Sequence, residues 1–137
     1  MKTLKYITLL LFFNITSAQL MTDYKAFSKK LTKIRQYNFK DSKNDCSQKI
    51  LYLGKITLTN KQTFKVLTSH INLGGKGVND LIFISEKNVE YIYRLDLPSD
   101  FPTYISKNKL YFDKNESMSV NELKELFCTP SGCFNRK

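Results

Sequence analysis

Apolar and polar residues recur along this chain with two different periods. Near residue 20 the apolar residues are spaced three or four positions apart, at Leu20, Tyr24, Phe27, Leu31 and Ile34. This spacing places the side chains on one stripe of an α-helix, and Thr22 or Asp23 can cap its first turn. The pattern therefore predicts an amphipathic helix that ends near Tyr37-Asn38, followed by a polar loop over residues 38–48.

From Ile50 onward the period changes to two, which is typical of half-buried strands. Polar tetrapeptides at 59–62, 85–88 and 106–109 interrupt the alternation, and each predicts the turn of a hairpin. The glycine cluster Gly74-Gly75-Lys76-Gly77 predicts one more connection. Connections this short join antiparallel strands, because parallel neighbours need a crossover of about a dozen residues. We expect an antiparallel meander of about six strands.

The last quarter of the chain returns to a helical spacing. Ser119-Val120-Asn121-Glu122 fits a capping box, and the apolar residues that follow would form a buried stripe at Val120, Leu123, Leu126 and Phe127. The predicted order is an amphipathic helix, a meander and a short C-terminal helix. This order predicts an α+β fold in which the helices cover one face of the sheet.

The first eighteen residues have the pattern of a cleavable export signal. Lys2 and Lys5 precede an apolar run over Ile7–Ile15, and the small residues Thr16-Ser17-Ala18 follow it. The apolar run is about half of the ~20 residues needed to span a bilayer. We therefore expect residues 1–18 to be removed and residues 19–137 to form one domain. The expected location is the periplasm, the cell surface or the medium.

Positive charge is concentrated near the beginning of the domain. Between Tyr24 and Lys49, eight basic and two acidic side chains give a net charge of +6. The helical part of this stretch carries Lys25, Lys29, Lys30 and Lys33 opposite the apolar stripe. Like charges four residues apart disfavour a helix, so one interpretation of these lysines is contact with an anionic envelope component or protein. The competing interpretation, a solvated helix face, is the commoner origin of such a run of charge. Export and the lack of interleaved aromatic residues argue against nucleic acid as the partner.

Three cysteines in an exported chain predict a disulfide. Cys128 and Cys133 flank the tetrapeptide Thr129-Pro130-Ser131-Gly132, which suits a tight turn that brings the two residues together. The alternative pairing joins Cys46 to either of them. A zinc site is not expected, because the cysteine spacing is wrong and the chain has a single histidine.

No set of residues in the sequence predicts catalysis, and no cofactor is expected. Ser69 and His70 are adjacent in a predicted strand, so their side chains point to opposite faces. The glycine cluster lacks the Gly-Lys-Ser/Thr sequence of a phosphate-binding loop. The sequence therefore predicts a small exported binding protein. The alternatives are a secreted inhibitor or immunity protein and, third, a small hydrolase that uses His70 or Cys46.

Overall fold

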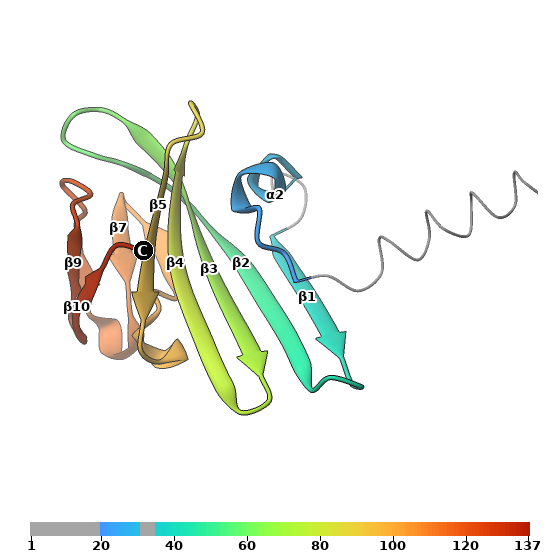
Figure 1. Ribbon diagram of the computed structural model, residues 1–137. Coiled ribbons are helices and arrows are strands. Elements are labelled where there is room, and N and C mark those ends of the chain that lie inside the picture. Colours follow the sequence, from blue (N-terminus) through green and yellow to red (C-terminus); the bar gives the residue numbers. More distant parts are fainter. Residues whose placement is uncertain (1–19, 31–34) are drawn as a thin grey trace, which may run out of the picture.

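The computed structural model describes residues 20–30 and 35–137. Strands make up 54% and helices 11% of these residues. The largest element is a five-stranded antiparallel sheet, the main sheet, in which every strand pairs with its neighbours along the chain (Figure 1). Its strands are β1 (Gln36–Asp41), β2 (Cys46–Thr57), β3 (Thr63–Leu73), β4 (Lys76–Ser85) and β5 (Glu90–Leu95). The predicted antiparallel pairing is present in this sheet.

The turn between β3 and β4 depends on two glycines. Leu73 and Lys76 are opposite one another in the register, so only Gly74 and Gly75 form the connection. Their φ angles are +56° and +92°, in the region that residues other than glycine rarely adopt. Two consecutive positive φ angles give the turn a twist that matches the twist of the flanking strands. The glycine cluster is therefore a tight hairpin turn.

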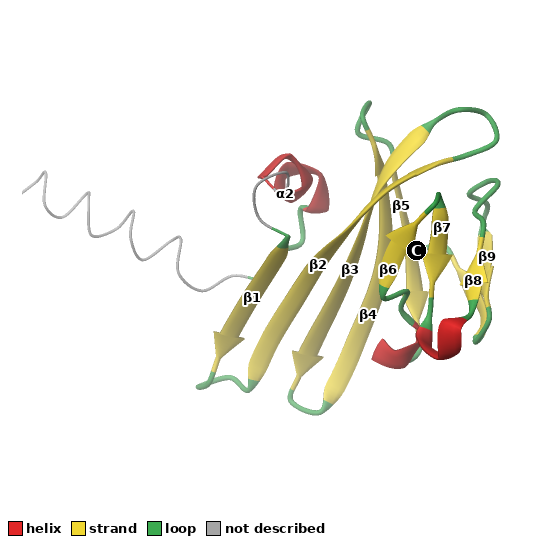
Figure 2. Cartoon of the chain, turned by 180° about the vertical axis from the view of Figure 1, so that it is seen from behind, coloured by secondary structure: helices red, strands yellow, loops and turns green. Residues whose placement is uncertain are grey.

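A second layer covers part of one face of the main sheet (Figure 2). It consists of a three-stranded sheet, β6 (Tyr104–Ser106), β7 (Lys109–Tyr111) and β8 (Ser117–Met118), and of the hairpin β9 (Leu126–Thr129) and β10 (Gly132–Asn135). The short 3-10 turn η1 (Pro98–Asp100) lies between β5 and β6, and η2 (Asp113–Asn115) lies between β7 and β8. Both layers contribute to the larger of two hydrophobic clusters, whose aromatic members include Phe64, Phe83, Tyr93, Phe112, Phe127 and Phe134.

The opposite face of the main sheet carries the helix α2 (Tyr24–Lys30). Tyr24 and Phe27 are buried there against Ile50, Leu67, Ile82 and Ile84. The Phe27 ring also meets the Tyr37 ring of β1 edge to face, with their centroids 5.3 Å apart. The larger cluster and this one lie on opposite faces because successive strand residues point to opposite sides, as Ile82 and Phe83 do.

The α+β prediction is wrong, since the described residues are mainly β. The predicted C-terminal helix is absent: residues 119–125 have no regular secondary structure, and Leu126–Thr129 is β9. A helix of so few residues is marginal by itself. In the structure, carbonyl groups of this segment bond distant residues instead: the Asn121 oxygen accepts a bond from the Thr59 amide, and the Lys124 oxygen accepts one from the Tyr93 hydroxyl.

The N-terminal predictions also need correction. The described helix has only seven residues, and the end of the predicted helix at residues 31–34 lies outside the described residues, as do residues 1–19 with the predicted signal. The predicted loop over 38–48 is replaced by β1, a tight turn and the start of β2. In β1 only Tyr37 and Phe39 are apolar, so the sequence of this strand resembles that of a polar loop. Within the described part of the chain, no helix has the length and apolar character needed to span a bilayer.

Candidate functional site

Three of the four predicted contact lysines lie on the exposed side of α2. Lys25, Lys29 and Lys30 are exposed, whereas Tyr24, Phe27 and Ser28 of the same helix are buried. Lys33 lies outside the described residues. The helix therefore presents its lysines to solvent, as its amphipathic pattern predicts.

Two lysines of the main sheet lie on the same face as α2. Lys65 donates a hydrogen bond from Nζ to the Ser28 carbonyl at 3.1 Å, and Lys55 is directly opposite Lys65 in the β2–β3 register. Like charges directly opposite one another on antiparallel strands destabilise the pair. The sequence alone singles out neither residue, because only the strand register places them near the helix. The basic surface is defined here as Lys25, Lys29, Lys30, Lys55 and Lys65.

The ion pairs of the described residues do not involve the lysines of the basic surface. These pairs join Arg94 to Asp80, Lys124 to Glu122 and Arg136 to Glu125, and none includes a lysine of the basic surface. Two carboxyl groups lie near the helix: that of Glu90 interacts with the charge of Lys25, and that of Asp23 caps the first turn. Burial raises the pKa of Glu90 above its usual range, and the charge of Lys25 acts in the opposite direction. Asp23 caps the helix by accepting a bond from the Ala26 amide at 3.0 Å.

A buried polar network holds the helix segment on the main sheet. The Tyr24 hydroxyl donates to the Ser69 hydroxyl at 3.0 Å, and the Gln48 amide donates to the same oxygen at 3.2 Å. Gln48 also bonds both backbone groups of Met21, at 2.6 and 2.8 Å. Buried polar groups with satisfied hydrogen bonds specify one arrangement of the surrounding chain. The network therefore positions the lysines of α2 relative to those of the sheet.

The other face of the main sheet contains a cleft of about 350 Å³. Its floor is formed by residues of β2 and β3, and its wall by the segment between β5 and β6. We call this the sheet cleft, lined by Lys49, Leu51, Thr68, His70, Pro98, Phe101, Pro102 and Thr103.

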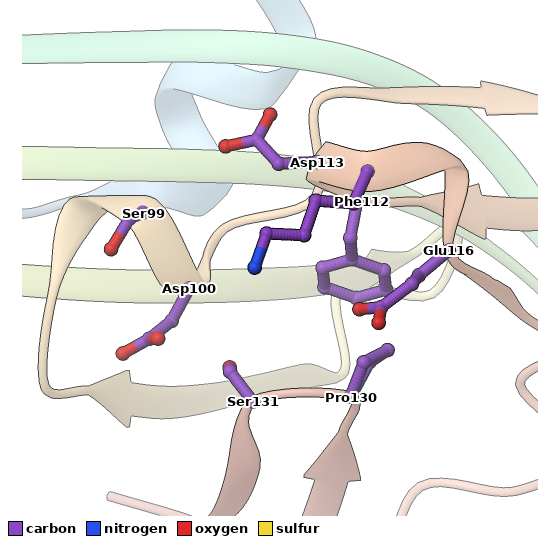
Figure 3. A pocket seen from close by; sticks show the side chains of 8 residues that line it. Ser99, Asp100, Phe112, Asp113, Glu116, Pro130 and Ser131 are labelled. Carbon is purple, nitrogen blue, oxygen red and sulfur yellow. The ribbon is translucent and has the colours of Figure 1, made fainter.

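A pocket of about 330 Å³ in the second layer is acidic (Figure 3). Its lining includes Asp100, Asp113 and Glu116, which come from two segments of the chain. The Asp100 carboxylate already accepts a bond from the Leu97 amide at 2.9 Å, which stabilises η1. Among the described residues no three metal-binding side chains are close enough to hold an ion together. These carboxylates therefore do not form a metal centre.

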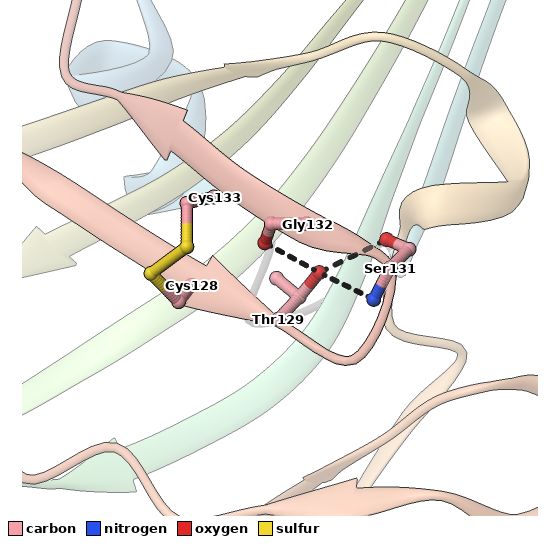
Figure 4. The surroundings of a disulfide bond; sticks show 5 residues. All are labelled: Cys128, Thr129, Ser131, Gly132 and Cys133. Carbon is pink, nitrogen blue, oxygen red and sulfur yellow. Dashed lines mark hydrogen bonds between the residues drawn. A yellow bond between two sulfur atoms is a disulfide. The ribbon is translucent and has the colours of Figure 1, made fainter.

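The predicted disulfide between Cys128 and Cys133 is present (Figure 4). The two residues are opposite one another on β9 and β10, with their Cα atoms 3.9 Å apart. Thr129 closes the turn, since its hydroxyl accepts a bond from the Ser131 amide at 3.2 Å. The disulfide thus locks the hairpin that carries Phe127 and Phe134 into the larger cluster. Cys46 has a free thiol.

The residues considered for hydrolysis do not meet. Ser69 bonds Tyr24 beneath α2, whereas His70 bonds Asn79 on the opposite face, with Nδ1 and Oδ1 2.6 Å apart. Cys46 pairs with Leu73 in the β2–β3 register and shares the face of Ser69, away from His70. Neither a Ser–His nor a Cys–His pair can form in this arrangement.

Comparison with protein-family models, curated proteins and solved structures gave no match.

Proposed function

We propose that this protein is an exported binding module that attaches to an anionic polymer of the cell envelope through the basic surface. One observation carries the proposal. Five lysines from α2, β2 and β3 lie on one side of the molecule, and no ion pair among the described residues neutralises them. The opposed pair Lys55 and Lys65 is unfavourable for the free protein, and a negatively charged partner relieves that repulsion.

The composition of the surface favours a polymer over a protein or a lipid bilayer. Protein interfaces are enriched in aromatic residues and arginine and depleted of lysine. A helix that enters a membrane surface exposes large apolar side chains, but the exposed residues of α2 are Lys25, Ala26, Lys29 and Lys30. Lysine is a compact charge on a flexible stem, which suits a partner with many similar anionic groups. An acidic polysaccharide has this character.

Export is the second part of the proposal. It rests on the signal-like pattern over residues 1–18. The Cys128–Cys133 disulfide is compatible with it, because disulfides persist in oxidising compartments. Detection of the processed chain outside the cytoplasm, with Gln19 as its first residue, tests this part separately. Recovery of the unprocessed chain in the cytoplasm would contradict it.

The binding test compares two triple variants of equal charge. The first changes Lys29, Lys30 and Lys55 to glutamine. The matched control changes Lys107, Lys109 and Lys114, which are exposed in the second layer, to glutamine. Affinity for polygalacturonate is measured by calorimetry between about 50 and about 300 mM sodium chloride, a range over which exposed charges become progressively screened.

We expect the first variant to bind at least about tenfold more weakly than the unchanged protein, because each lysine near an anionic surface contributes about 1 kcal/mol. The control variant should bind within about twofold of the unchanged protein, because its three lysines lie outside the basic surface. A twofold change is well below the 1.4 kcal/mol that corresponds to tenfold. Equal losses in both variants would show that only net charge matters and would contradict the assigned surface. Binding to phosphatidylglycerol vesicles without binding to the polymer would replace the proposed partner by a membrane.

A further inference from the structure

We propose that the sheet cleft binds a small organic carboxylate with an apolar body. This site lies on the opposite face of the main sheet from the basic surface, and the inference does not depend on the polymer-binding proposal. It rests on the shape of the cleft, the residues that line it and the charge at one side of it.

The cleft forms where the second layer ends. In Figure 2 the lower halves of β1, β2 and β3 have no strand covering them, whereas β6 contacts β2 at Gly54 and β10 contacts β5. The segment between β5 and β6 forms a wall at this boundary. Its apolar residues Pro98, Phe101 and Pro102 line the cleft together with Leu51 of the floor. A volume of about 350 Å³ lies within the usual range for small-molecule sites.

The wall is held in a fixed conformation before any ligand arrives. Two prolines restrict its backbone. The Asp100 carboxylate accepts a bond from the Leu97 amide, and the Phe101 amide donates to the Pro98 carbonyl at 3.2 Å. Pro102 is buried. A wall of this kind loses little conformational entropy when a ligand binds, which favours binding.

The floor supplies a charge and a hydrogen-bonding group side by side. Lys49 and His70 are opposite one another in the β2–β3 register and point to the same face. Thr68, only 4% exposed, lines the cleft beside them. The ammonium group of Lys49 is the group that can pair with a carboxylate. The ligand's apolar body then lies against the prolines and Phe101.

The ring of His70 is oriented by a second residue. The Asn79 amide donates from Nδ2 to the Asp96 carbonyl at 3.1 Å, so its Oδ1 is the atom that faces His70. Nδ1 of His70 therefore carries the hydrogen of their bond, and Nε2 takes no part in it. Packing and hydrogen bonding of this sort are typical of side chains that orient a ligand. We assign Asn79 to holding the His70 ring, His70 to positioning the ligand on the floor of the cleft, and Lys49 to the contact with the ligand's carboxylate.

Three naphthalene compounds of nearly identical shape separate charge from packing. They are 2-naphthoate, which carries the carboxylate, 2-naphthamide, which is neutral, and 2-naphthylmethylammonium, which is positive. Each is titrated into the purified protein while amide shifts are followed by nuclear magnetic resonance. We expect 2-naphthoate to bind most tightly and to shift amides of residues 49–51, 68–70 and 98–103.

Two lysine variants then test the assigned contact. Lys49→Met keeps the aliphatic stem and removes the charge. Lys40→Met is the matched control, since Lys40 is on the same face of the neighbouring strand β1 but does not line the cleft. Lys49→Met should weaken 2-naphthoate binding about tenfold, the effect of losing one charged hydrogen bond, and leave 2-naphthamide unchanged. Lys40→Met should change the affinity for either compound by no more than about twofold, well below the tenfold loss expected for Lys49→Met.

Three results would overturn the inference. One is no binding of 2-naphthoate at concentrations up to about 5 mM, which is weaker than a specific site provides. Another is equal affinity for the carboxylate and the amide. The last is a set of shifts located at the acidic pocket or the basic surface. The Lys29, Lys30 and Lys55 variant should bind 2-naphthoate normally, so failure of this site and failure of the polymer site are distinguishable.

Discussion

Asp80 and Arg94 form a two-point ion pair on the face of the main sheet that carries α2. Arg94 Nε lies 3.0 Å from Asp80 Oδ1, and Nη2 lies 3.3 Å from Oδ2. The Asp80 side chain is only 3% exposed, whereas that of Arg94 is 47% exposed. The hydrogen bond to Asp80 raises the pKa of Arg94 further above its usual range. The buried carboxylate thus depends on a partner that reaches it from the surface.

This asymmetry predicts unequal effects of removing each partner. Arg94→Met leaves a buried carboxylate without its cation and should destabilise the protein by about 3 kcal/mol. Asp80→Asn leaves the guanidinium in contact with solvent and should cost about 1 kcal/mol, close to the loss of one net hydrogen bond. Urea denaturation of both variants measures the difference. Equal losses would contradict the asymmetry.

Tyr93 predicts a loss of stability in alkaline solution. Its side chain is fully buried and donates to the Lys124 carbonyl at 2.6 Å, and burial raises its pKa to about 12. The unfolded chain releases this proton near pH 10, so stability is intact below pH 10 and falls as the pH rises from about 10 to about 12. The change amounts to roughly 2–3 kcal/mol.

The variant Tyr93→Phe removes this contribution and nothing else that titrates. Below pH 9 it should be less stable than the unchanged protein by about 1 kcal/mol, because the hydrogen bond is lost. Between pH 10 and pH 12 the gap should close and then reverse, since only the unchanged protein has Tyr93 to ionise and its loss of roughly 2–3 kcal/mol exceeds the gap of about 1 kcal/mol. Unfolding free energies across this range provide the measurement. A constant gap would show that Tyr93 does not titrate differently in the folded state.

Asn108 should contribute more to stability than another asparagine of the same backbone conformation. Its side chain bonds both backbone groups of Thr57, at 2.7 and 2.9 Å, and so ties the β6–β7 turn to β2. Asn88 has a similar φ of 61°, against 59° for Asn108, and lies in the β4–β5 turn. Asn108→Ala should cost about 2 kcal/mol more than Asn88→Ala, since two hydrogen bonds are lost in addition to the strain. Thermal unfolding of the two alanine variants separates the hydrogen bonds of Asn108 from the backbone strain that both positions share.

The disulfide predicts a moderate effect, because it closes a short loop. Changing Cys128 and Cys133 together to serine should lower the unfolding free energy by about 2 kcal/mol. The aromatic residues of the hairpin keep their hydrophobic contacts, so the fold should persist. Near-ultraviolet circular dichroism checks that persistence, and denaturation measures the loss. A double variant that unfolds at 25 °C would show that the hairpin depends on the disulfide for its position.

Local patterns predicted most of the main sheet. The turns at 59–62 and 85–88 and the glycines before β4 connect strands of the main sheet, and the turn at 106–109 connects β6 to β7 of the second layer. Each joins strands that are neighbours along the chain, so no distant partner had to be known. The helix over 119–127 failed for the opposite reason. Val120 and Phe127 are buried and Leu123 is half-buried, because an extended segment that gives its carbonyls to Thr59 and Tyr93 also buries these side chains. Leu126, the remaining residue of the predicted stripe, is exposed.

The candidate sites needed the register as well. The sequence indicates the charge of Lys25, Lys29 and Lys30 directly, because helical spacing is local. Lys65 and Lys55 are ten residues apart and meet once the β2–β3 hairpin forms. Lys49 and His70 lie beyond the bulge between Tyr52 and Gly54, so their opposition depends on its register shift. One residue more or less would change which side chains share a face.

Pairing each strand of the main sheet with its chain neighbour has a consequence for how the protein reaches its native state. Every ladder of this sheet can close from a hairpin, so no long segment has to be held in place while a distant one arrives. Topologies with such local contacts fold faster than sheets assembled from remote strands. A chain that crosses a membrane unfolded, as the proposed export requires, can therefore assemble this sheet hairpin by hairpin before its exposed strands meet those of another molecule.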